Sequence, residues 1–124
     1  MATVAKVKPY EAGTSLLEGW NFTGDGEGDA IFASAMGDRC ATVAGTFDGA
    51  TVTLQGTNSL DGEPNQDWFT LHDVFGNLLT FTSSGAATGL KVILETPYRT
   101  RAIVTGAGAG CNLRARIYAR RTQR

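Results

Sequence analysis

The sequence predicts an all-β protein: one antiparallel β-sandwich, jelly-roll-like in character. Three observations support this class. The chain has 124 residues, of which 42% are hydrophobic, a length and composition typical of a single globular domain. From residue 40 onward, short segments rich in threonine, valine and aromatic residues alternate between polar and apolar. Turn sequences rich in glycine, asparagine and aspartate separate these segments, a spacing that favours a sandwich.

The beginning of the chain is expected to differ from the rest. Residues 1–13 are predicted to form an extended N-terminal arm, and the sandwich domain to span residues 14–124. Pro9 interrupts the alternating pattern of the arm, and because proline cannot donate to a sheet, a central strand is not expected there. No segment approaches the roughly 18 apolar residues of a membrane span or resembles a signal peptide, so we expect a soluble protein made in the cytoplasm.

Three short elements are predicted between the arm and residue 40. Residues 14–20 suit a single helical turn that begins at a hydroxyl residue and ends at Gly19. Residues 24–29, GDGEGD, are expected to be an acidic loop. Residues 30–34 are predicted to form a short apolar strand.

The remaining strands follow from period-two alternation. They are predicted at 40–47, 50–57, 67–73, 78–83, 89–95, 98–105 and 111–120. Asp48-Gly49 is the best hairpin signal among the turns. The alternation also predicts which strand faces form the core. These faces contain Val52 and Leu54; Leu90, Val92 and Leu94; and Leu113, Ala115 and Ile117.

The charge is divided along the chain although the net charge is only −1. Residues 11–73 contain eleven acids and one base, and residues 95–124 contain seven arginines and one acid. Opposite poles on one small protein favour contacts with copies of itself or with another protein. Nucleic acid is not expected as a partner, because the acidic half would repel phosphate.

The arginines alternate with apolar residues on the last two predicted strands, and two explanations stay open. Charged side chains protect an edge strand from unwanted pairing. Alternatively, the choice of arginine over lysine indicates an interface, because the guanidinium group grips carboxylates in a bidentate way. If the two strands pair, their arginines form one basic patch. The candidate contact residues are Arg99, Arg101, Arg114, Arg116 and Arg120, which would meet acids of a partner or the Asp25, Glu27 and Asp29 of a neighbouring copy.

The sequence contains no pattern typical of catalysis, and neither a metal nor a cofactor is expected. His72 has no nucleophile motif beside it and is interpreted as a surface or packed residue. Residues 106–110, GAGAG, precede a strand and not a helix, so they are read as a hairpin loop and not as a phosphate site. The acidic loop is most simply solvated, with weak calcium binding as an alternative. Cys40 and Cys111 are interpreted as free thiols, with a disulfide left open.

About half of the chain, roughly residues 45–106, resembles small β-structured head proteins of tailed bacteriophages. The shared pattern consists of a turn and strand, a tryptophan, a second strand and turn, and a late arginine strand. In this sequence it is supplied by Phe47, Gly49–Gly56, Trp68, Thr70, Leu71, Asp73, Gly76, Phe81, Arg101 and Val104–Gly106.

This resemblance implies a capsid decoration, or cement, protein that stabilises the head. It would bind the outer lattice of the major capsid protein as a homodimer or homotrimer and reside on the virion. A small structural protein of the phage tail or neck is an alternative. A further alternative is a carbohydrate-binding jelly-roll module, in which Trp20, Trp68 and Tyr98 would stack on sugars.

Overall fold

The computed structural model describes residues 2–32, 36–83 and 89–121, and within these residues it contains eleven strands and no helix. The predicted all-β class is confirmed. In chain order the strands are β1 (Thr3–Val4), β2 (Lys6–Ala12), β3 (Ser15–Phe22), β4 (Gly26–Gly28), β5 (Asp38–Thr46), β6 (Thr51–Thr57), β7 (Phe69–Thr70), β8 (Thr80–Phe81), β9 (Lys91–Val92), β10 (Arg99–Thr105) and β11 (Asn112–Arg120).

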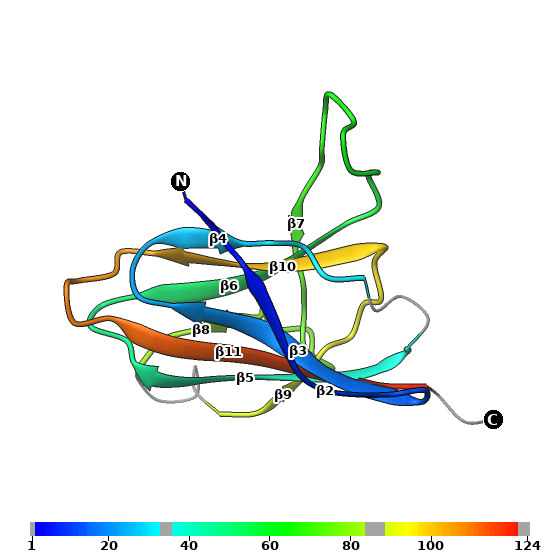
Figure 1. Ribbon diagram of the computed structural model, residues 1–124, viewed down its shortest axis with the longest axis horizontal. Coiled ribbons are helices and arrows are strands. Elements are labelled where there is room, and N and C mark those ends of the chain that lie inside the picture. The colour runs from blue at the N-terminus through cyan, green and yellow to red at the C-terminus, as the bar shows by residue number, and fades with distance from the viewer. Residues whose placement is uncertain (1, 33–35, 84–88, 122–124) are drawn as a thin grey trace.

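Two sheets pack against each other as a β-sandwich (Figure 1). Sheet A has the order β1-β4-β10-β6-β7, with β8 also paired to β6, and sheet B has the order β2-β3-β11-β5-β9. Every pairing between these strands is antiparallel except that of β1 with β4. The long strands β10 and β6 form the centre of sheet A, and β3, β11 and β5 form the centre of sheet B.

The backbone also connects the two sheets along both sides of the sandwich. On one side the N-terminal segment passes from sheet A, where β1 pairs with β4, to sheet B, where β2 pairs with β3. The predicted arm is therefore extended but lies at the sheet edges. On the other side, Asp73 pairs with Ile93, and the Leu94 N–H donates to the His72 carbonyl at 2.9 Å.

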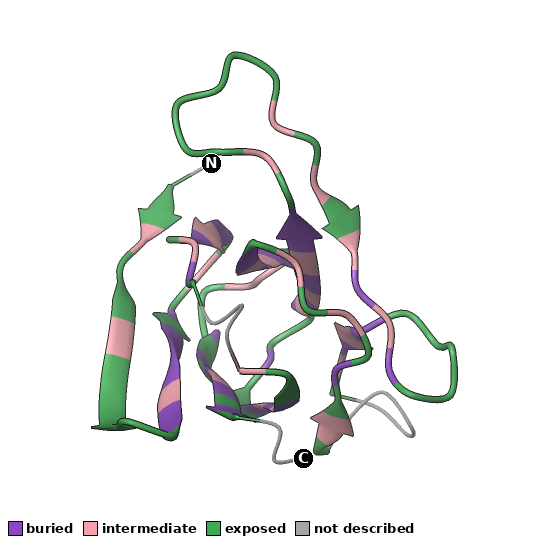
Figure 2. Ribbon diagram, turned by 90° about the vertical axis from the view of Figure 1, so that its right-hand side faces the viewer, coloured by how far each residue is buried: buried purple, intermediate pink, exposed green. Residues whose placement is uncertain are grey.

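The core lies between the sheets, and buried residues alternate with less buried ones along the long strands (Figure 2). The largest fully buried side chains are Trp20, Phe22, Phe81, Ile31, Leu54, Leu79, Leu113, Ile117, Val52 and Val104. The predicted inward faces of residues 50–57 and 111–120 are thus confirmed. Burial of this apolar surface is the main favourable term for folding.

Two ionisable side chains are also buried on the inner face of sheet B. Glu18 is 4% exposed and lies opposite Ile117, and burial raises its pKa, although Lys8 and Lys6 oppose the shift. Arg39 is 3% exposed, and burial lowers its pKa. Its guanidinium donates to Thr100 Oγ1 at 3.0 Å and to the Glu95 carbonyl oxygen.

Residues 14–20 do not form the predicted helical turn, because Thr14 lies in a turn and the residues from Ser15 onward belong to β3. Gly19 was interpreted as the end of a helix, but it has a different role in the structure. A Cβ at this position would lie 1.9 Å from the Ala115 carbonyl oxygen of β11. The glycine therefore permits close contact between two central strands, and pairing in the sheet overrides local helical tendency.

Asp48-Gly49 forms the expected tight turn but not the expected hairpin. Both residues have positive φ, 47° and 83°, and the Ala50 N–H donates to the Phe47 carbonyl at 3.0 Å. The preceding strand, β5, lies in sheet B and the following strand, β6, lies in sheet A. The turn chemistry reverses the chain without specifying which strand it pairs with next.

The strands predicted between residues 67 and 95 are much shorter in the structure, with two residues each in β7, β8 and β9. In the predicted 30–34 strand, Ile31 makes an isolated bridge to Thr100, and residues 33 and 34 lie outside the described residues. The expected acidic loop contains β4. The core prediction for Leu90, Val92 and Leu94 is wrong, because these side chains are exposed and Ile93 between them is buried.

Candidate interaction surfaces

The C-terminal arginines are divided between the two outer faces of the sandwich. β10 belongs to sheet A and β11 to sheet B, so the single basic patch expected from their pairing does not form. The connecting loop 106–110 crosses between the sheets and is held by Asp48, which accepts N–H groups from Gly108 and Gly110. Arg99 and Arg101 lie on sheet A, and Arg114, Arg116 and Arg120 lie on sheet B.

Arg101 is occupied within the molecule. Its guanidinium carbon lies 4.0 Å from the centroid of the Trp68 ring, which is a cation–π geometry. Nη1 lies 3.3 Å from Glu27 Oε2, and Nε donates to Gln55 Oε1 at 3.1 Å. Burial lowers the pKa of Arg101, and the charge of Glu27 partly opposes this shift. The side chain therefore stabilises sheet A.

Arg99 holds the base of a loop that projects from the body between β6 and β7 (Figure 1). Its Nε and Nη2 donate to the Ser59 carbonyl at 3.1 and 2.9 Å, and Nη2 also donates to Gln66 Oε1 at 2.6 Å. Asp61 lies 3.8 Å from Nη1. Since Ser59 and Gln66 stand at opposite ends of the loop, one guanidinium ties the two ends together.

The three predicted acidic contact residues do not form one site. Asp25 accepts the Ala107 N–H at 2.7 Å, Glu27 pairs with Arg101, and Asp29 is exposed. In the part of the chain that the structure describes, no three His, Cys, Asp or Glu side chains are grouped as a metal site. Asp25 and Glu27 therefore already have partners within the chain.

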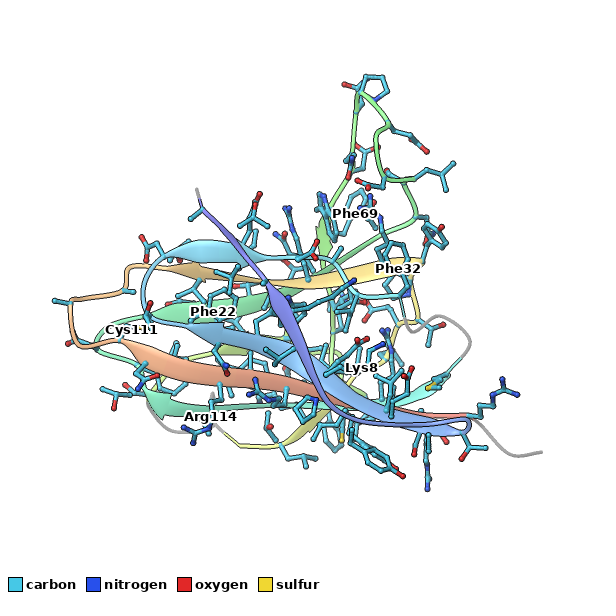
Figure 3. The ribbon with its side chains drawn as sticks, in the orientation of Figure 1. Lys8, Phe22, Phe32, Phe69, Cys111 and Arg114 are labelled. Atoms are coloured by element: carbon cyan, nitrogen blue, oxygen red, sulfur yellow. The ribbon has the colours of Figure 1, made fainter. Side chains whose placement is uncertain are left out.

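Arg114 and Arg116 stand on the outer face of sheet B, at its central strand. Their neighbours in β3 and β5 are short: Arg116 lies between Gly19 and Thr42, and Arg114 lies between Asn21 and Ala44. Figure 3 shows Arg114 pointing away from the body. Among the described residues, neither arginine has a carboxylate within ion-pair distance. We call these two arginines and their four neighbours the basic face.

The two arginines of the basic face are held differently. Arg116 donates to the carbonyl oxygens of Trp20 and Ala115 at 2.9 and 3.0 Å, and to Asn21 Oδ1 at 2.8 Å. Burial, and then the positive charge of Arg114, lower the pKa of Arg116. Arg114 is exposed. An anion at this face would relieve the repulsion between the two guanidinium groups.

Arg120, the third predicted contact residue on sheet B, pairs with Asp38 at 3.4 Å. Both residues line a hollow of about 520 Å³ at the edge of the sheet, together with Cys40. The rest of the lining is largely apolar and includes Val74, Val92, Leu94 and Tyr118.

Four exposed apolar side chains line this hollow, Val74, Val92, Leu94 and Tyr118, and three more belong to the same chain segments, Phe75, Leu78 and Leu90. They come from the turn at 73–78, from residues 90–94 and from β11. We call them the apolar flank: Val74, Phe75, Leu78, Leu90, Val92, Leu94 and Tyr118. In the sequence, this surface is signalled only by the alternation of apolar residues in 89–95. That alternation predicted that Leu90, Val92 and Leu94 face the core, and the structure shows them exposed.

His72 is half-buried and belongs to a tight pair with Glu95. Its Nδ1 lies 2.6 Å from Glu95 Oε2, and its backbone N–H donates to Oε1 at 2.7 Å. Burial opposes ionisation of Glu95, but the backbone and ring hydrogen bonds of His72 outweigh it, so the pKa of Glu95 is lowered. This pair lines a groove of about 630 Å³ together with Phe69.

The aromatic residues considered for sugar stacking do not share a surface. Trp20 is fully buried, Trp68 lies against Arg101, and Tyr98 makes an edge contact with Phe32. Both cysteines are free thiols, as interpreted: Cys111 is buried and Cys40 is half-buried. Burial raises the pKa of both thiols.

Comparisons with known proteins supply no relative for this chain: protein-family models, curated proteins and solved structures all returned no match. Among the described residues, there is also no helix that would cross a bilayer.

Proposed function

We propose that this chain is a non-enzymatic structural protein that decorates a bacteriophage head and stabilises it. The resemblance over residues 45–106 suggests this class of protein. The observation that carries the proposed binding mode is the basic face, where Arg114 and Arg116 have no carboxylate partner among the described residues. The partner would be the major capsid protein, presenting acidic side chains at the outer surface of the shell.

The chemistry of the basic face suits such a partner. Short neighbouring side chains leave the guanidinium groups accessible, and the hydrogen bonds of Arg116 hold one group in place before binding. A preorganised guanidinium loses less conformational entropy when it binds a carboxylate. Many copies on one lattice would then convert individually modest contacts into firm attachment.

The proposal is tested by mixing purified protein with emptied phage shells. Saturating protein should co-sediment with the shells and raise the temperature at which they rupture. Absence of both effects on shells of the cognate phage would contradict the proposed function. Raising the salt concentration should weaken binding, because contacts between exposed charges are screened.

Arg114 is the cleaner residue for mutation, because Arg116 also supports the backbone. We expect Arg114→Gln to weaken shell binding about tenfold, corresponding to about 1.4 kcal/mol, without changing the melting temperature. Thr105→Glu is the matched control, since it changes the net charge equally at an exposed position of sheet A. Equal losses in both variants would show that net charge, and not the basic face, determines binding.

A further inference from the structure

Residues 90–94 of the apolar flank carry large apolar side chains on both faces of the strand. Ile93 is buried in the core, whereas Leu90, Val92 and Leu94 point outward. Sequences of this kind are typical of strands that are covered on both faces. Here only one face is covered by the chain itself.

The second segment of the flank lies beside the first and is firmly shaped. Asp73 bridges to Ile93, and its Oδ1 accepts the N–H groups of Phe75 and Asn77 at 2.9 and 3.0 Å. This turn presents the Phe75 side chain at 86% exposure. Because the backbone is already ordered, burying the ring against a partner would require little additional ordering of the chain.

The charges around the flank distinguish between possible partners. The ammonium group of Lys91 lies 5.9 Å from the Phe81 ring centroid, and Arg120 is paired with Asp38. In a symmetric contact each residue meets the same surface of the other copy, so unbalanced like charges would repel. A contact centred on Arg114 and Arg116 would bring like charges together, whereas the seven side chains of the apolar flank are uncharged.

The size of the flank also fits a second copy. Its seven side chains are between 40% and 86% exposed. At roughly 150–200 Å² for each fully exposed large side chain, this amounts to about 600–800 Å² per copy. Two copies would bury roughly 1,200–1,600 Å², within the range of specific protein interfaces.

We infer that two copies of this chain associate symmetrically through the apolar flank. The contact is made by side chains, because both backbone edges near Ile93 are already paired, with β5 on one side and with residues 72–73 on the other. Arg114 and Arg116 lie on the same outer face of sheet B as Tyr118, beside the apolar flank and not within it. The dimer depends on the side chains of the apolar flank and the shell contact on Arg114, and the two are measured with different variants and assays, so either can fail without the other.

Sedimentation equilibrium of the full chain tests the inference. The wild-type protein should be a dimer at roughly 100 µM and dissociate on dilution. We expect Leu90→Ser with Leu94→Ser to weaken association at least about thirtyfold, because residues at an interface centre often contribute this much. Leu60→Ser is the matched control: Leu60 is 55% exposed, close to the 65% of Leu90, but lies on the projecting loop.

Cys40 provides a second measurement because it lies in the hollow of the flank, whereas Cys111 is buried. Alkylation of Cys40 should slow as protein concentration rises, and the double variant should lose this dependence while keeping the wild-type circular dichroism spectrum. A wild-type monomer at 100 µM, or an oligomer other than a dimer, would overturn the inference. So would a dimer that forms equally well in the Leu90 and Leu94 variant.

Discussion

Arg101 and Arg114 occupy similar positions in the sequence pattern, yet the structure predicts opposite consequences for their removal. Arg101 is 17% exposed at its side chain and contacts Trp68, Glu27 and Gln55. Arg114 is exposed, without a carboxylate partner in the described part of the chain. Replacing each by alanine therefore asks whether an arginine is structural or available for binding.

The expected cost of Arg101→Ala follows from its contacts. A largely desolvated cation–π contact contributes about 1–2 kcal/mol, and a partly exposed ion pair adds up to about 1 kcal/mol. The hydrogen bond to Gln55 contributes about 1 kcal/mol. Because these contacts share one group and are not additive, we expect the unfolding free energy to fall by about 2–3 kcal/mol. Arg114→Ala should change it by less than about 0.5 kcal/mol.

Urea unfolding followed by tryptophan fluorescence measures both variants. A double-mutant cycle with Glu27→Gln should give a coupling of about 0.5–1 kcal/mol for the pair with Arg101. If Arg101→Ala is no more destabilising than Arg114→Ala, the assignment of Arg101 to the fold is wrong. The two arginines would then both be available for a partner.

Three further predictions concern other residues. Arg99→Ala should increase the rate of limited proteolysis within loop 58–67 several-fold, because the tie between its two ends is lost; unchanged cleavage would argue against that role. Gly19→Ala should destabilise the protein by about 3 kcal/mol or more in chemical denaturation, since its Cβ would meet the Ala115 carbonyl oxygen. A loss below about 1 kcal/mol would contradict this contact. Folding raises the pKa of Glu18 above its ordinary 4.5, so ionisation opposes folding and stability falls as pH rises through this interval. Glu18→Gln should therefore raise the melting temperature at pH 7, and this advantage should disappear at pH values below the ordinary pKa of the carboxyl group.

Much of the sandwich could be predicted because its long strands carry their own period-two signal. Strands β5, β6, β10 and β11 lie within two residues of their predicted bounds. Their inward residues were identified from parity, since alternate side chains point to opposite faces. The helical turn predicted around Gly19 was wrong because glycine is favoured both at the end of a helix and where two strands approach closely. The sequence alone does not distinguish these two roles.

The candidate site was less predictable because it depends on which strands become neighbours. Turn residues reverse the chain, but they do not determine whether it returns to the same sheet or crosses to the other. The crossing at loop 106–110 separates Arg99 and Arg101 from Arg114 and Arg116. The pairing of Arg101 with Glu27, far away in the sequence, carries no local signal.

The amino-acid sequence alone determined that this chain is built from strands, because alternation and turn chemistry are properties of neighbouring residues. It also placed the arginines on strand faces opposite the core. Only the tertiary structure determined which arginines are neutralised within the molecule and that Leu90, Val92 and Leu94 face outward. The physical reason is that a strand with apolar residues on both sides has two acceptable orientations, and packing of the whole sandwich selects one.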